Sequence, residues 1–294
     1  MPTLAEVREK YLKKLERDQD KSDRTKQTYK EGLRRFFKVL DPSAGVTSLE
    51  VSVIDDLAES MVNLAPSTQR LTFNIAKSFL SFVITRHPRV DITPHALEQV
   101  VKDNLPSTPK KKELDFEAVE SLLEKAAGWD RNITEKRNRA IVYLFAHSGI
   151  RLDELRKLER SDIDLSDRRF KIRNGKGDKP RTGYLSKIAG KFLKEYLKER
   201  DDSYPWLFID HRGLESVTVI DALGRSTIRK IVRPYGLSPH ALRHYCISRL
   251  ANDPERGVYI AQQVAGHSRI ATTEGYLHPR ENDIADAMNG AFDE

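Results

Sequence analysis

A histidine and an arginine stand three residues apart in the string Ser238-Pro-His-Ala-Leu-Arg-His244. Residues at this spacing share one face of a helix, so the His240 imidazole and the Arg243 guanidinium are expected to converge. An arginine binds two nonbridging oxygens of a phosphodiester through its planar fork, and a histidine exchanges a proton near neutral pH. Taken alone, the same string more often marks a structural histidine beside a surface arginine.

A second arginine follows a glycine in the string Ser148-Gly-Ile-Arg-Leu-Asp-Glu154. Gly149 is expected to end a helix and to mark the sharp bend that presents the Arg151 side chain. Glu154 comes one helical turn later, where its carboxylate can orient a neighbouring catalytic side chain. The alternative is a routine i,i+3 ion pair, which contributes about 0.2–0.5 kcal/mol.

A lysine flanked by glycines lies in the string GKGDKPR at 175–181. The glycines let the backbone approach another surface closely, and Lys176 at the tip of the expected turn can reach outward. The spacing of a phosphate-binding P-loop is absent, and these glycines join strands instead of opening a helix. The sequence therefore does not favour the binding of a nucleoside triphosphate.

The same hairpin is strongly basic, with seven basic residues and one acidic residue between Arg168 and Arg181. A basic ribbon suits a DNA groove or backbone, and Arg173, Lys179 and Arg181 are the expected DNA contacts. A solvated hairpin would have the same composition, and both interpretations stay open.

The last string with chemical potential is AGHSRIATTEGYLHP at 265–279. His267 follows a glycine at an expected helix end, and Tyr276 comes nine residues later in a short segment expected to be helical. The chain contains ten tyrosines and eight histidines, so residue type alone singles out neither of them. Their position relative to the other strings must decide whether His267 and Tyr276 are catalytic or structural.

Helices are predicted for residues 1–103, because apolar residues recur there at three- and four-residue spacing. One apolar stripe consists of Tyr29, Leu33, Phe36, Phe37 and Leu40. A second one follows the helix start at Pro66 and consists of Leu71, Ile75, Phe79, Phe82 and Val83. Both stripes are interpreted as core packing.

A linker is predicted at 104–113, where the string NLPSTPKKKE combines prolines, small hydroxyl residues and a lysine run. Lys110, Lys111 and Lys112 are either a solvated charge run or contacts to DNA phosphates.

The pattern after the linker predicts a mixed domain. An apolar helix spans Ala140 to His147, and a new helix carries Leu152, Leu155 and Leu158. Phe170 and Ile172 alternate with basic residues as in a half-buried strand, and a second strand around Thr182 to Leu185 completes a hairpin. Another helix starts at Ser238, with Pro239 in its first turn.

The composition suits a two-domain globular protein with a polyanionic partner. The chain has 294 residues, 38% of them hydrophobic and 32% charged, and a net charge of +7. Clustered Lys and Arg release counterions condensed on nucleic acid. A single cysteine, Cys246, excludes an intrachain disulfide and a multi-cysteine zinc site. No apolar run approaches the ~18 residues of a membrane span, and no signal peptide is evident, so we expect a cytoplasmic protein.

The strings SGIRLDEL, GKGDKPR, SPHALRHY and AGHSRIATTEGYLHP, in this order, resemble the catalytic domain of tyrosine recombinases, also called phage integrases. The resemblance implies a mainly α fold with a small antiparallel β-sheet in the catalytic domain, arranged as a two-domain DNA clamp. Residues 1–103 would form a helical core-binding (SAM-like) DNA-binding domain, 104–113 the linker and 114–294 the catalytic domain.

The resemblance also implies a role for each residue of these strings. Arg151 and Arg243 would clamp the scissile phosphate, with Glu154 supporting the first arginine, and Tyr276 would be the nucleophile. The remaining catalytic positions are Lys176, which would protonate the departing 5′ oxygen, and His240 and His267. Tyr245 and Ala265 depart from the common pattern but are not catalytic positions.

The implied reaction forms a 3′-phosphotyrosyl intermediate and needs no metal, cofactor or ATP. Its partners would be double-stranded DNA with specific recombination sites, four protomers on two sites and accessory DNA-bending proteins at the nucleoid, with no membrane. A C-terminal stripe of Ile284, Ala287, Met288 and Phe292 could dock on a neighbouring protomer or on its own domain. Two alternatives are a type IB topoisomerase, which shares this chemistry, and a DNA-binding protein that does not cut.

Overall fold

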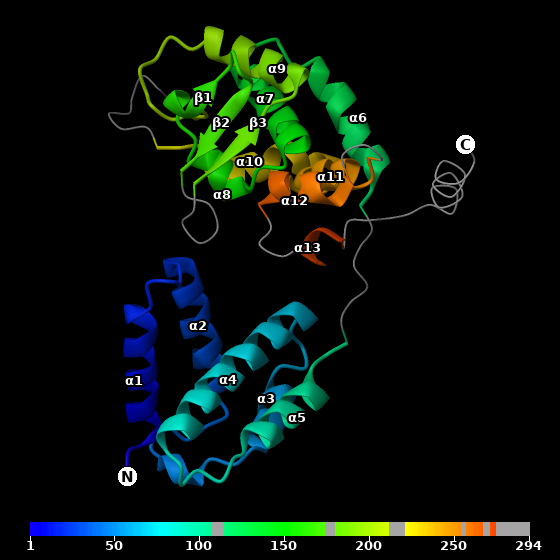
Figure 1. Cartoon of the computed structure of the whole chain (residues 1–294). Coiled ribbons are helices and arrows are strands. Elements are labelled where there is room, and N and C mark those ends of the chain that lie inside the picture. Colours follow the sequence, from blue (N-terminus) through cyan, green and yellow to red (C-terminus); the bar gives the residue numbers. More distant parts are fainter. Residues whose placement is uncertain (108–113, 174–179, 212–220, 254–256, 267–270, 275–294) are drawn as a thin grey trace, which may run out of the picture. The chain divides into compact units, whose positions relative to one another are not determined.

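The computed structural model describes the chain except for residues 108–113, 174–179, 212–220, 254–256, 267–270 and 275–294. Two compact units make up the chain, Met1–Lys112 and Glu113–Glu294, and each has its own hydrophobic core (Figure 1). Among the described residues, none of the helices is both long and apolar enough to cross a bilayer.

The described part of the N-terminal unit is helical, as expected. Its elements are α1 (Leu4–Arg17), α2 (Asp23–Phe36), the 3₁₀ turn η1 (Val46–Ser48), α3 (Val53–Ser60), α4 (Pro66–Arg86) and α5 (Pro94–Asn104). Local signals set these bounds. Thr3 and Glu6 form a capping box at the start of α1, and α4 begins at Pro66, whose missing N–H costs nothing in a first turn.

The two predicted apolar stripes meet in the core of this unit, with one exception. The rings of Phe37 and Phe79 pack edge to face, with centroids 5.4 Å apart. Leu71 was expected to be buried but is 42% exposed. The buried face of α4 runs through Thr72, Ala76 and Phe79, and one residue of helix rotates a side chain by about 100°, which turns Leu71 away from that face.

The C-terminal unit confirms the expected fold class, mainly α with a small antiparallel sheet. Its described elements are α6 (Phe116–Ala127), α7 (Ile133–Ser148), α8 (Leu152–Arg156), η2 (Arg160–Asp162), β1 (Ile163–Asp164), β2 (Arg169–Ile172), β3 (Arg181–Tyr184), α9 (Lys187–Lys198), α10 (Arg225–Val232), η4 (Arg233–Tyr235), α11 (Pro239–Ala251), α12 (Gly257–Ala265) and α13 (Ala271–Glu274).

The sheet has the strand order β1-β2-β3, with both neighbouring pairs antiparallel. The predicted hairpin is β2 with β3, and Ile172 pairs with Arg181. Phe170 and Ile172 are buried, as their alternation indicated. The strand β3 begins one residue earlier than expected, and β1 was not expected because two residues are too few to show a period.

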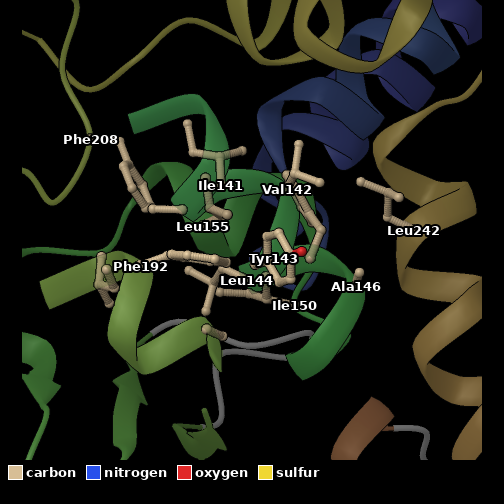
Figure 2. Close-up of a cluster of buried hydrophobic side chains, with 14 of the residues drawn as sticks. Ile141, Val142, Tyr143, Leu144, Ala146, Ile150, Leu155, Phe192, Phe208 and Leu242 are labelled. Atoms are coloured by element: carbon tan, nitrogen blue, oxygen red, sulfur yellow. The ribbon is translucent and has the colours of Figure 1, made fainter. Parts of the chain in front are cut away.

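Helix α7 is the centre of the C-terminal core. Ile141, Val142 and Phe145 are fully buried, because α6, α9, α10 and α11 all contact this helix. Figure 2 shows its side chains surrounded by those of neighbouring elements, among them Phe192 of α9 and Leu242 of α11. The helix is longer than the apolar string that predicted it, since Asn132 caps an earlier, more polar first turn.

Candidate active site

Arg151 emerges directly after the end of α7. The helix stops at Ser148, and Gly149 follows with a φ of 60°, the left-handed conformation expected of a terminating glycine. Arg151 is then the residue before the first turn of α8, and 27% of its side chain is exposed. The predicted bend therefore presents this arginine at a rigid corner between two helices.

Glu154 holds Arg151 by two contacts. Its Oε2 accepts a hydrogen bond of 2.9 Å from the Arg151 backbone N–H, and its Oε1 accepts one of 2.8 Å from Nη1. The Glu154 side chain is only 5% exposed. The pair is thus an i,i+3 ion pair, as the sequence allowed, but it is buried and locks both the backbone and the side chain of Arg151.

Arg181 of β3 binds the same carboxylate. Its Nη2 donates to Glu154 Oε2 over 2.7 Å, so one carboxylate lies between two guanidinium groups. Burial by itself would raise the pKa of Glu154, but the Arg151 N–H and the charge of Arg181 outweigh it, and the pKa is lowered. Burial also lowers the pKa of Arg181, and repulsion from Arg151 adds to the effect.

Arg243 is buried in α11 and is not a surface arginine. Ser238 caps this helix and Pro239 opens it, as predicted. The Arg243 side chain donates to the Gly149 carbonyl oxygen and, over 2.8 Å, to that of Ala265. His240 lies one turn earlier at an exposed position.

Three arginines from three elements meet at the end of α12. Arg181 donates to the Val264 carbonyl over 3.2 Å, and Arg243 donates to the next carbonyl, that of Ala265. Arg151 donates to the third carbonyl, that of Gly266, over 3.2 Å. We call Arg151, Arg181 and Arg243 the arginine cluster. The carbonyl end of a helix carries partial negative charge, which three cations neutralise here.

Of the remaining predicted residues, only Arg173 lies within the described part of the chain. Lys110, Lys111, Lys112, Lys176, Lys179, His267 and Tyr276 lie outside the described residues. In sequence, His267 follows the last residue of α12 by two positions, and Tyr276 follows the last residue of α13 by two. Both residues therefore follow the arginine cluster closely in sequence.

Arg173 lies at the end of β2, and its DNA contact stays a prediction. Its Nη1 lies 2.8 Å from Glu159 Oε1, and its Nε lies 2.7 Å from Asp162 Oδ1. These hydrogen bonds raise the pKa of Arg173. With 46% of its side chain exposed, the guanidinium still reaches solvent.

The sequence did not indicate the contact between Glu154 and Arg181. These residues are 27 positions apart in different elements, and no local spacing connects them. The basic ribbon did identify Arg181, but as a DNA contact. Only the tertiary structure, which brings Arg181 of β3 to Glu154 of α8, reveals its partner.

Cys246 lies one helical turn after Arg243 and is buried. Burial raises the pKa of its thiol to about 12. Among the described residues, no three His, Cys, Asp or Glu side chains are grouped as metal ligands would be.

Curated relatives align with much or all of the chain. The TnP I resolvase of Bacillus thuringiensis is 28% identical over 95% of this chain and 96% of its own. The tyrosine recombinase XerD of Mycobacterium tuberculosis is 28% identical over 99% and 98%. The tyrosine recombinase XerA of Pyrococcus furiosus is 31% identical, over 53% of this chain and 54% of its own.

Solved structures share the fold. The Tn1549 transposon integrase in complex with transposon right end DNA has a TM-score of 0.72 at 19% identity, covering 100% of both chains. A lambda integrase dimer bound to a COC′ core site also has a TM-score of 0.72, at 16% identity over 95% of this chain and 97% of that one.

The family model decides the assignment. The model of the phage integrase family matches residues 112–283. This range is more than half of the chain, and it contains all the strings that carry the predicted chemistry. The chain therefore belongs to the phage integrase family and is a tyrosine recombinase.

Proposed function

We propose that this recombinase breaks and rejoins DNA at specific sites through a 3′-phosphotyrosyl link to Tyr276. The observation that carries the proposal is the convergence of Arg151 and Arg243 at the end of α12. His267 and Tyr276 follow the last residue of α12 by two and eleven positions in sequence. Two phosphate-binding cations from separate elements thus meet at the end of the helix that precedes the proposed nucleophile in sequence.

Cleavage exchanges one phosphoester bond for another. The Tyr276 oxygen attacks phosphorus while the 5′ oxygen of the DNA leaves, and Lys176 gives the leaving oxygen its proton. A tyrosine hydroxyl with a pKa near ~10 needs help to lose its proton, and His240 and His267 are the candidate acceptors. A 5′ hydroxyl from a partner strand then attacks the link and releases Tyr276, so no ATP is consumed.

The two arginines would stabilise the transition state. Charge builds on the nonbridging oxygens during phosphoryl transfer, and donors already held in place stabilise it without reorganisation. Arg151 is fixed by Glu154, and Arg243 is fixed by backbone carbonyls. Each guanidinium has five N–H donors in a fixed fork, so a backbone contact still leaves donors on the same group for a phosphate.

The other partners follow from the same reaction. The helical residues 1–103 would bind the recombination site as a core-binding domain, and with the catalytic domain, 114–294, would clamp the duplex. Exchange of four strands would need four protomers on two sites, with accessory DNA-bending proteins where a site requires them. Acting on DNA, the protein would work in the cytoplasm, at the nucleoid.

Relaxation of supercoiled DNA by a type IB topoisomerase mechanism uses the same cleavage chemistry. The relatives named as recombinases and a resolvase favour strand exchange. Two labelled duplexes carrying the target site distinguish the two activities. A recombinase yields joined products of both duplexes, whereas relaxation without such products would contradict the proposal.

The nucleophile is tested with a nicked duplex that traps the covalent adduct. We expect the wild-type chain to form an adduct that survives denaturing electrophoresis. Tyr276→Phe should abolish the adduct and leave DNA affinity within about twofold, because one hydroxyl adds no phosphate charge contact. Tyr259→Phe is the matched control, since this tyrosine of α12 is 62% exposed. An adduct that persists in Tyr276→Phe would refute the assignment.

A further inference from the structure

Arg181 is the member of the arginine cluster to which the proposed reaction gives no role. The basic composition of its hairpin suggested a DNA contact. In the structure its guanidinium instead joins two protein groups, the Glu154 carboxylate through Nη2 and the Val264 carbonyl through Nη1. Its side chain is 18% exposed, and Nε is buried without a hydrogen-bond partner in the described structure. Both terminal nitrogens of the guanidinium are thus engaged within the protein.

The stem of Arg181 also lies against Gly266. This glycine has a φ of 61°, and a β-carbon placed on it would come within 3.1 Å of both Cδ and Nε of Arg181. A side chain at 266 would therefore be strained by its backbone and would push the arginine aside. The stem of Arg181 thus packs on Gly266, which directly precedes His267 in sequence.

These contacts connect the two halves of the proposed site. On one side, Glu154 binds both the backbone and the side chain of Arg151. On the other side, the end of α12 starts the stretch of chain that leads to Tyr276. Arg181 contacts both sides with separate nitrogen atoms of one planar group.

We propose that Arg181 is a positioning residue for strand cleavage. It fixes Arg151 through Glu154, and it fixes the end of α12, from which the chain runs to His267 and Tyr276, through Val264 and Gly266. The inference rests on the proposed function, because it assigns Arg181 an effect on the rate of phosphotyrosyl formation. It assigns Arg181 no part in DNA affinity, in contrast to the expectation from the hairpin's charge.

An arginine is required for this geometry. Its rigid fork presents several donors in fixed directions, so that one group can bind a carboxylate and a carbonyl at once. A lysine at 181 would keep the positive charge but offers a single ammonium on a flexible stem. Arg181→Lys should therefore keep the contact to one partner and lose the fixed relation between the two.

The test separates binding from chemistry on a nicked duplex that carries the target site. For each variant we would measure DNA affinity at several salt concentrations, the single-turnover rate of adduct formation at saturating DNA, and the thermal unfolding temperature. Arg181→Met is expected to keep its affinity within about twofold and its salt dependence unchanged, because no phosphate contact is lost. Its adduct should form roughly 10- to 100-fold more slowly, the cost of small misplacements in an active site. Arg181→Lys should lie between this variant and the wild type.

Arg131→Met is the matched control. It removes one positive charge and an arginine–glutamate pair, that of Arg131 with Glu135. Arg131 precedes α7 and Arg151 follows it, and a helix of 16 residues separates its ends by about 24 Å. The control should match the wild type in affinity and rate.

A second variant keeps the test decisive if Arg181→Met does not fold. Gly266→Ala retains every side chain of the arginine cluster but displaces the stem of Arg181. We expect it to slow adduct formation and to leave the salt dependence of binding unchanged. Together with Arg181→Lys, it tests the same contact without removing a cationic partner of the buried Glu154 carboxylate.

The outcomes are distinguishable. If the slope of log affinity against log salt falls by about 0.9 in Arg181→Met and the rate at saturating DNA is unchanged, Arg181 is a phosphate contact and the inference is wrong. Equal rates and affinities in wild type and Arg181→Met would also refute it, while the proposed function would stand. If the wild-type chain itself forms no adduct, the proposed function fails and the inference fails with it.

Discussion

Arg243 and Ala265 are 22 residues apart in sequence and are joined by a hydrogen bond of 2.8 Å from Nη2 to the backbone carbonyl. The same guanidinium donates to the carbonyl of Gly149. A single buried side chain therefore joins the end of α7 to the end of α12, before any DNA is bound.

Arg243→Lys is expected to lower both stability and cleavage. One ammonium cannot reproduce the two directions of the fork, so a buried carbonyl loses its donor, at a cost of about 1–3 kcal/mol. Urea unfolding measures the stability loss, and adduct formation on nicked DNA measures the cleavage. A lysine variant with wild-type stability would contradict the structural role of this side chain.

Glu154→Gln should destabilise the C-terminal unit at neutral pH. Glutamine is nearly isosteric but removes the charge that lies between Arg151 and Arg181, and hydrogen bonds to charged groups contribute about 1.5–3 kcal/mol each. The pKa of Glu154 is lowered in the folded chain, so its contribution is present above pH 4.5 and is lost as the pH falls toward the folded pKa. The difference in unfolding free energy between variant and wild type should therefore shrink below pH 4.5. A difference independent of pH would show that the charge is unimportant.

His211 should make the fold less stable in mild acid. Burial, followed by the charges of Arg137 and Arg200, lowers the pKa of His211 from 6.5 to about 4, and its Nε2 lies 3.0 Å from the Tyr196 hydroxyl. Between these pH values the unfolded chain binds a proton that the folded chain does not, so stability falls as the pH falls. The shift corresponds to roughly 3 kcal/mol, and about 1–2 kcal/mol remains after allowing for partial exposure.

The measurement is urea unfolding of the wild type and His211→Gln at pH 7 and pH 5. The wild type should lose more stability between the two values than the variant does. Parallel losses in both chains would assign the pH dependence to other groups.

Arg200→Met is expected to be far more damaging than Arg169→Met, although each removes one arginine. The Arg200 side chain is fully buried, binds Asp202 and donates to the carbonyls of Trp206 and Leu207. Removing one partner of a buried pair costs about 3–5 kcal/mol. Arg169 pairs with Asp164 and Asp167 at the surface with 53% of its side chain exposed, and exposed pairs contribute about 0–1 kcal/mol. Comparable melting temperatures for the two variants would contradict this ranking.

Elements whose ends carry local signals were predictable from sequence. Ser238 and Pro239 define the start of α11, and Gly149 defines the end of α7. The alternation of Phe170 and Ile172 defines β2. Each of these signals involves only residues close together in sequence, so the side-chain types there determine the local backbone conformation.

Contacts set by tertiary packing were not predictable in the same way. The exposure of Leu71 depends on which face of α4 meets its neighbours. The same distinction holds in the candidate site. The ion pair of Arg151 with Glu154 is local in sequence and was anticipated. The contact of Arg181 with Glu154 exists only once β3 is placed beside α8. The roles of Lys176, His267 and Tyr276 remain predictions.

Cys246 gives the chain a reporter of its own motions. It is the only cysteine, it is buried one turn beyond Arg243, and its raised pKa keeps the thiol protonated and unreactive. A thiol reagent can therefore modify the folded chain only when α11 opens around this residue. The labelling rate therefore measures how readily α11 opens. Slower labelling in the presence of DNA would show that bound DNA suppresses the opening of α11, the helix that carries Arg243.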